Sequence, residues 1–227
     1  MATRKLFQTA STTCRTLCKA PALRHSRSPF PRSLTSSAIH INRRTFASTL
    51  PTHASHADNL STTDPLIQKA QEWFDKGTEK WNEEDYQGAL DAYEKSIWSR
   101  PTADAHYNVA NCYLALGNYE KAIKSWQESL ALSPSRSDAH INIANVTALK
   151  LRDLPTAITH YEAALSIDPT DGEARYNFGV VLDSMGRLEE AIEQYEKAVQ
   201  SGVEVAEKNL RNAKAKLKER EVGGGKA

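Results

Sequence analysis

Small and aromatic apolar residues recur at a fixed spacing through the second half of the chain. In four places an alanine is followed four residues later by an aromatic residue, so the two lie one turn apart on one face of a helix. The pairs are Ala89 and Tyr93, Ala122 and Trp126, Ala157 and Tyr161, and Ala191 and Tyr195. Successive alanines are 33, 35 and 34 residues apart. The pattern predicts a helical unit that is repeated along the chain.

Each unit has another helical stretch before its alanine, joined to it by turn residues such as Gly117-Asn118 and Gly186-Arg187. Three units end in a proline, which lacks the amide donor that a helix needs. These prolines are Pro101, Pro134 and Pro169. The third unit has one extra residue in its internal turn (150–154), followed by Pro155, and we expect its hairpin to open slightly. We expect helical hairpins that bury their apolar faces by stacking.

This arrangement resembles the tetratricopeptide repeat, a helix–turn–helix unit of about 34 residues. The resemblance covers residues 66–202. It implies an all-α fold, a right-handed superhelix (α-solenoid) of about four helical hairpins with a C-terminal capping helix. The expected repeats are residues 66–102, 103–136, 137–171 and 172–202.

Both ends of the repeat region carry their own signals. Asp64 is a favourable N-cap and Pro65 suits the first helical turn, so we expect the structured region to begin at residue 64. After the fourth repeat Gly202-Val203 replaces the expected proline, and an apolar stripe follows at helical spacing. Its residues are Val203, Ala206, Leu210, Ala213 and Leu217. We expect a capping helix over residues 203–221 and a disordered tail over residues 222–227.

The N-terminal segment has a different composition. Residues 1–46 hold nine basic residues and no acid, and they are rich in Ser and Thr, which is typical of a mitochondrial transit peptide. The segment 43–48 resembles sites of the matrix processing peptidase, which predicts cleavage after Phe46. Residues 47–63 are polar and read as a disordered linker. The expected location is the mitochondrial matrix; the alternative is a basic tail with no import role.

Charge and cysteine content exclude several classes of protein. Residues 47–227 hold 20 basic and 28 acidic residues, a net charge near −8 that argues against a nucleic-acid partner. No apolar run reaches the ~18 residues of a membrane span, so we expect peripheral membrane contact or none. Only Cys112 of the three cysteines lies in the repeats, which excludes a disulfide framework.

Asparagines align in the first helices of the second, third and fourth repeats. Asn108, Asn142 and Asn177 form the column, with an aromatic or aliphatic residue before each and further asparagines one turn later in two repeats. The flanking residues are Tyr107, Ile141, Tyr176, Asn111 and Asn145. An amide can both donate to and accept from an extended backbone. The column is similar to the asparagine ladder in the repeat domain of O-linked N-acetylglucosamine transferase, and the resemblance implies a peptide-binding groove. The alternative is that the asparagines only tie helix ends together.

Chaperone-binding members of the family hold a C-terminal acidic tail with Lys, Asn and Arg at five positions. The corresponding residues here are Phe74, Thr78, Asn108, Asp138 and Asn142, and only Asn108 matches. Asp138 has the wrong charge for a carboxylate. We therefore do not expect the chain to bind the C-terminal acidic tail of heat-shock chaperones.

No catalytic motif, metal-ligand cluster or phosphate-binding glycine loop is present, so we expect no catalytic residues, metal or cofactor. His106, His140 and His160 are assigned to separate repeats. His106 and His140 occupy equivalent places near helix starts, where packing or capping is the usual role. Trp98 is either an outer partner anchor or a packing residue.

The predicted function is a non-catalytic mitochondrial adaptor or scaffold that binds an extended peptide of another protein, in the assembly of a complex. The main alternative is a permanent structural subunit bound through its convex face or capping helix. A hidden enzyme site and a nucleic-acid role rank lower.

Overall fold

The computed structural model describes residues 64–224. The predicted transit peptide (1–46), its cleavage site and the linker (47–63) lie outside this range. The described part contains nine α-helices, one short π-helix and no strand. They are α1 (Pro65–Asn82), α2 (Tyr86–Ser99), α3 (Ala103–Ala115), α4 (Tyr119–Leu132), α5 (Ser137–Val146), η2 (Thr147–Leu151), α6 (Leu154–Ile167), α7 (Gly172–Ser184), α8 (Leu188–Gln200) and α9 (Val205–Gly224). No helix in this part of the chain is both long and apolar enough to span a bilayer.

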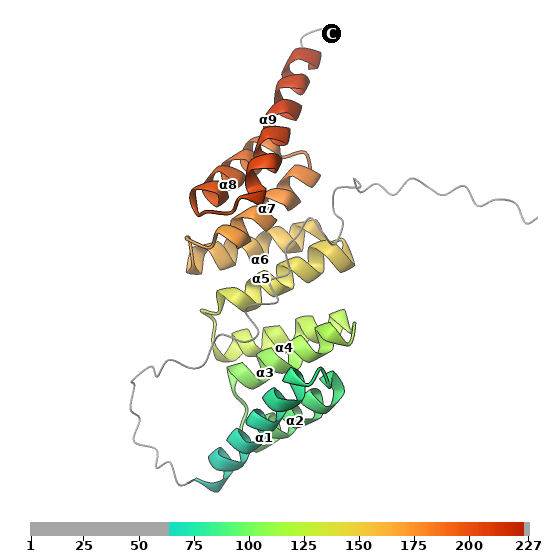
Figure 1. Cartoon of the computed structure of the whole chain (residues 1–227), viewed down its shortest axis with the longest axis vertical. Helices are drawn as coiled ribbons and strands as arrows, with labels where there is room; N and C mark the ends of the chain where they lie inside the picture. Colours follow the sequence, from blue (N-terminus) through green and yellow to red (C-terminus); the bar gives the residue numbers. More distant parts are fainter. Residues whose placement is uncertain (1–63, 225–227) are drawn as a thin grey trace, which may run out of the picture.

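The helices form four hairpins in a row, α1–α2 to α7–α8, and α9 follows the last of them (Figure 1). This confirms the predicted α-solenoid with its capping helix. Local sequence sets the helix starts: the side chains of Asp64, Asp85 and Asn118 accept hydrogen bonds from amides of the first turns of α1, α2 and α4. These caps satisfy donors that the helix itself leaves unpaired.

The repeated alanines and aromatics form the core, as predicted. All four alanines are fully buried, and the aromatic residues Tyr93, Trp126, Tyr161 and Tyr195 are at most 3% exposed. Two first helices carry a glycine directly under such a ring. A Cβ atom on Gly77 would lie 2.7 Å from the ring of Tyr93, and one on Gly179 would lie 2.7 Å from the ring of Tyr195. The aromatic side chain therefore requires a residue without a side chain opposite it.

The third hairpin departs from the others at its internal turn. After α5 the chain continues as the π-helix η2, and Arg152 then takes a left-handed conformation with φ of 60°. The amide of Asp153 reaches back to the Thr147 carbonyl at 2.9 Å, which closes the wider turn. The extra residue is thus absorbed as a π-bulge rather than as a longer loop.

Helix α9 covers the last hairpin with its buried Ala206 and Ala213. Lys216 pairs with Asp183 of α7 at 2.7 Å, and Arg220 pairs with Glu189 of α8. The helix runs to Gly224, three residues past the expected end, and its C-terminal part projects beyond the hairpins (Figure 1). Residues 222–224 are therefore helical rather than part of a tail, because the helix continues past the apolar stripe.

Candidate functional site

A groove of about 610 Å³ runs between α1, α2 and α3 and ends at Arg136, just before α5. Its walls combine aromatic and polar side chains. The aromatic ones are Phe74, Trp81, Tyr93 and Tyr107. Asn108 of α3 and Arg100, which follows α2, add polar groups. This combination suits an extended peptide, whose backbone needs hydrogen bonds and whose side chains need apolar contact.

Arg136 closes one end of the groove through internal ion pairs. Its guanidinium donates to Asp104 at 2.5 Å and to Asp138 at 3.1 Å, and it lies over the ring of Tyr107, 4.4 Å from the centroid. Burial disfavours the charge, but the hydrogen bonds to Asp138 and Asp104 raise the pKa of Arg136 overall. Both carboxylates at these helix starts are therefore paired within the chain.

The guanidinium of Arg100 differs from that of Arg136 in its pairing. Across residues 64–224 it has neither a hydrogen-bond partner nor an ion pair, although it lines the groove. A guest carboxylate or carbonyl can therefore reach it without displacing an existing contact. The sequence contained this signal, an Arg before the proline that ends the first repeat, but the repeat pattern assigned it no role.

The asparagine column is split between groove and core. Asn108 is partly exposed and lines the groove. Asn142 is 8% exposed and its Nδ2 donates to the Tyr107 hydroxyl at 3.0 Å, while Asn177 is 1% exposed. The expected row of three available amides is therefore not seen: of the three column residues, only Asn108 lines this groove. The physical reason is local packing, because the second hairpin brings the Tyr107 hydroxyl to Asn142 and the core around Asn177 buries it.

Asn111 and Asn145 connect helices within the fold, as the alternative interpretation of the asparagines expected. Trp126 Nε1 donates to Asn111 Oδ1 at 3.2 Å, and the Tyr161 hydroxyl donates to Asn145 Oδ1 at 2.5 Å. In the first hairpin the hydroxyls of Thr78 and Tyr93 lie 3.1 Å apart. In the first three hairpins the aromatic residue of the alanine–aromatic pair therefore bonds to a polar residue of the preceding helix, 15 or 16 positions earlier.

The two remaining predicted groove residues, Ile141 and Tyr176, lie apart from the groove between α1 and α3. Ile141 is partly buried on α5. Tyr176 is 6% exposed, and its hydroxyl accepts a hydrogen bond from Asn209 of α9 at 3.2 Å. Tyr176 therefore anchors the capping helix to the last hairpin.

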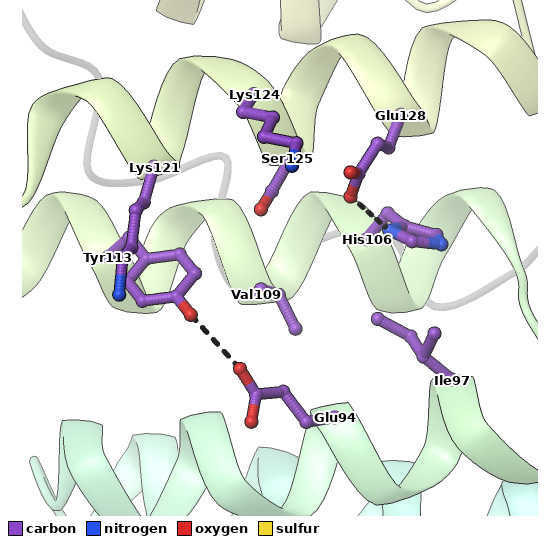
Figure 2. Close-up of a pocket in the computed structure, with 9 residues that line it drawn as sticks. All are labelled: Glu94, Ile97, His106, Val109, Tyr113, Lys121, Lys124, Ser125 and Glu128. Carbon is purple, nitrogen blue, oxygen red and sulfur yellow. Dashed lines mark hydrogen bonds and ion pairs between the residues drawn. The ribbon is translucent and has the colours of Figure 1, made fainter.

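A second hollow of about 320 Å³ lies between α2, α3 and α4 (Figure 2). The Tyr113 hydroxyl donates to Glu94 at 3.0 Å across one side of it. On the other side His106 Nδ1 lies 3.1 Å from the Glu128 carboxylate, without the alignment of a hydrogen bond. Lys121 and Lys124 border it as well, so charges of both signs surround the hollow.

His140 and His160 lie together, with their Nδ1 atoms 3.0 Å apart. Assigning the histidines to separate repeats was wrong for this pair, because both belong to the third hairpin. No group of three or more His, Cys, Asp or Glu side chains with metal-binding geometry occurs within the described range.

Cys112 is fully buried, and burial raises the pKa of its thiol to about 12, as suits a core residue. Trp98 is 84% exposed and does not pack within the described part. Its predicted role as an anchor for a partner protein therefore stays a prediction.

Two protein-family models, both described as tetratricopeptide repeat, match residues 103–136 and 148–218. Dynein axonemal assembly factor 4 of Rattus norvegicus is 29% identical over 177 residues, which are 66% of this chain and 42% of that protein. The chain spans less than half the length of the curated relatives it matches, from 20% to 42%.

Solved structures share the fold. A double mutant of MamA matches with a TM-score of 0.62 and 21% identity, over 70% of this chain and 91% of that one. The first repeat domain of Spaghetti (RPAP3), solved with an HSP90 peptide, matches with a TM-score of 0.50 and 24% identity, over 53% of this chain and 95% of that one. At these identities the likeness concerns the fold.

Proposed function

We propose that the chain is a non-catalytic mitochondrial adaptor that binds an extended segment of another protein. The match of residues 103–136 and 148–218 to tetratricopeptide-repeat models supports the protein-binding part of this proposal. Tetratricopeptide repeats mediate protein–protein interactions, and helical solenoids use extended concave surfaces for this purpose. The binding site is the groove between α1 and α3, and the setting is the assembly of a protein complex.

The groove itself carries the proposal. It is the larger of the two hollows described above, at about 610 Å³ against about 320 Å³. It presents aromatic rings together with Asn108 and with the guanidinium of Arg100, which is unpaired within residues 64–224. A guest with a carboxylate or backbone carbonyl opposite Arg100 fits this surface.

The clamp of chaperone-binding relatives does not fit. Thr78 bonds to the Phe74 carbonyl and to the Tyr93 hydroxyl, both at 3.1 Å, and Asp138 is held by Arg136. Asn142 is bound to Tyr107. The guest is therefore a segment other than the acidic C-terminal tail of a heat-shock chaperone.

A permanent structural subunit is the second candidate, and Trp98 favours it. An indole that is 84% exposed on the outer end of α2 is a suitable anchor for a fixed partner. The two candidates place the partner at different surfaces, one at the groove and the other at the exposed Trp98, which does not line the groove.

Site-specific photo-crosslinking distinguishes them. Benzoylphenylalanine is introduced at Asn108 or at Trp98 of the full chain, and intact organelles are irradiated. The adaptor predicts a protein adduct from position 108 and little from position 98. An adduct from position 98 alone contradicts the groove and supports the subunit.

The mitochondrial location rests on the acid-free, basic composition of residues 1–46. Residues 1–46 fused to a fluorescent protein are expected to enter isolated mitochondria only while the membrane potential is maintained. Exclusion of the fusion, or uptake that is independent of the potential, contradicts the proposed location.

A further inference from the structure

Two imidazole rings face each other inside the third hairpin. His140 on α5 and His160 on α6 have their ring centroids 5.2 Å apart, and the two Nδ1 atoms are separated by 3.0 Å. Both side chains are partly exposed, so ions in solution can reach them. Two neutral rings satisfy this contact when one Nδ1 carries a hydrogen and the other accepts it.

The neighbouring hairpins show what is particular about this pair. In the second hairpin the equivalent His106 faces the Glu128 carboxylate at 3.1 Å. In the fourth, Arg175 donates to Gln194 at 3.0 Å. Each of these three hairpins thus has a polar contact between its two helices at this level, but among them only the third supplies two nitrogen atoms that can both offer a lone pair.

The surroundings keep these nitrogens available. Burial lowers the pKa of both rings, and the nearby His140 ring lowers the pKa of His160 further, so both are neutral near pH 7. Asp138, the nearby acid that opposes the shift at His140, is held by Arg136 and by the Ala139 amide. It therefore does not compete for the rings as an ion-pair partner.

The separation matches two ligands at a right angle around one ion. With metal–nitrogen bonds of about 2.0–2.1 Å, neighbouring ligands at 90° lie about 2.9 Å apart, whereas tetrahedral ligands lie about 3.4 Å apart. The observed 3.0 Å is close to the first value. Square-planar and tetragonal sites of this kind are typical of Cu²⁺ and Ni²⁺.

We propose that His140 and His160 form a two-nitrogen site for a divalent transition-metal ion of tetragonal geometry, Cu²⁺ or Ni²⁺, with water in the remaining positions. The hydrogen on one Nδ1 moves to Nε2 of the same ring, so the pair releases no net proton when the ion binds. The bound ion links α5 to α6 beside the π-helix and stabilises the most irregular hairpin of the described repeats.

Thermal unfolding of the full chain with and without Ni²⁺ tests the site. An ion that binds only the folded pair raises Tm by about 5–10 °C at 100 times its Kd. His140→Asn and His160→Asn are expected to abolish this shift, each compared with its own metal-free Tm. His106→Asn is the matched control and is expected to retain it. The remaining histidines do not change the Tm shift if they bind Ni²⁺ equally well in the folded and in the unfolded chain.

Cu²⁺ electron paramagnetic resonance on the same proteins gives a second readout that does not depend on stability. One equivalent of Cu²⁺ is expected to show nitrogen superhyperfine splitting that is lost in the His140→Asn/His160→Asn variant and kept in His106→Asn. A wild type without a Ni²⁺ shift, or a double variant that keeps both signals, overturns the proposal and leaves the two rings as a hydrogen-bonded pair only.

Discussion

Replacing Asn145 by alanine tests whether the deeper asparagines lock hairpins or serve a guest. Asn145 is 2% exposed, Tyr161 is fully buried, and the Tyr161 hydroxyl donates to Asn145 Oδ1 at 2.5 Å. Asn145→Ala leaves this hydroxyl in the core without its acceptor. An unsatisfied buried polar group costs about 1–3 kcal/mol, and we expect the free energy of unfolding to fall by about 2 kcal/mol. For a domain of this size Tm then falls by roughly 4–8 °C.

The assay is urea and thermal unfolding followed by far-ultraviolet circular dichroism, completed as a double-mutant cycle with Tyr161→Phe. Removing both partners leaves no unpaired group, so the double variant is expected to be more stable than the sum of the single losses predicts, by about 1 kcal/mol or more. Asn108→Ala is the matched control, because Asn108 is a partly exposed groove residue; its effect is expected to stay within about 0.5 kcal/mol. Equal losses for Asn145→Ala and Asn108→Ala, or strict additivity in the cycle, would refute the reasoning.

Three further outcomes are expected. Gly179→Ala places a Cβ atom 2.7 Å from the ring of Tyr195 and should lower the free energy of unfolding by about 1–3 kcal/mol in the same urea assay; an unchanged midpoint contradicts the close packing. In a Cys14→Ser/Cys18→Ser background, Cys112 should react with a thiol reagent at pH 8 only as the chain unfolds, because burial raises the pKa of its thiol from 9.0 to about 12. The contribution of this thiol to the free energy of unfolding is complete below pH 9 and declines between pH 9 and 12. Rapid labelling of the native protein at pH 8 contradicts this prediction. The pKa values of His140 and His160 are lowered below 6.5, so the unfolded chain takes up protons before the folded chain does, and the free energy of unfolding should fall as the pH drops below 6.5. In urea titrations, His160→Asn should make this fall less steep. An unchanged pH profile in the variant contradicts the lowered pKa of His160.

The spacing of alanine and aromatic residues was sufficient to predict the hairpins, because burial on one helical face is a local property of the sequence. Ala122 and Trp126 are both fully buried, as the repeat requires. The capping helix was also predictable, since the apolar stripe that begins at Val203 continues at helical spacing. Its end at Gly224 was not, because residues 222–224 lie beyond the apolar stripe on which the prediction rested.

The groove was predicted less well, because helical periodicity gives the direction of a side chain but not its depth. Asn108 and Asn142 occupy equivalent positions, yet the Tyr107 hydroxyl, 35 residues earlier in the chain, reaches only Asn142. Arg100 was missed because it stands in a connection between repeats. The pairing of His140 with His160 was missed because the two were counted in different repeats, although both lie between residues 137 and 171.

Occlusion of the groove with a bulky side chain tests the central claim most directly. The segment crosslinked at position 108 is synthesised as a peptide, and its Kd is measured by fluorescence polarisation for the wild type, Asn108→Trp and Lys124→Trp. Both substitutions introduce the same indole, one in the groove between α1 and α3 and the other at the smaller hollow between α2, α3 and α4. The account predicts at least a tenfold weaker Kd, about 1.4 kcal/mol, for Asn108→Trp and an unchanged Kd for Lys124→Trp. Unchanged binding by Asn108→Trp, with loss in Lys124→Trp, would contradict it.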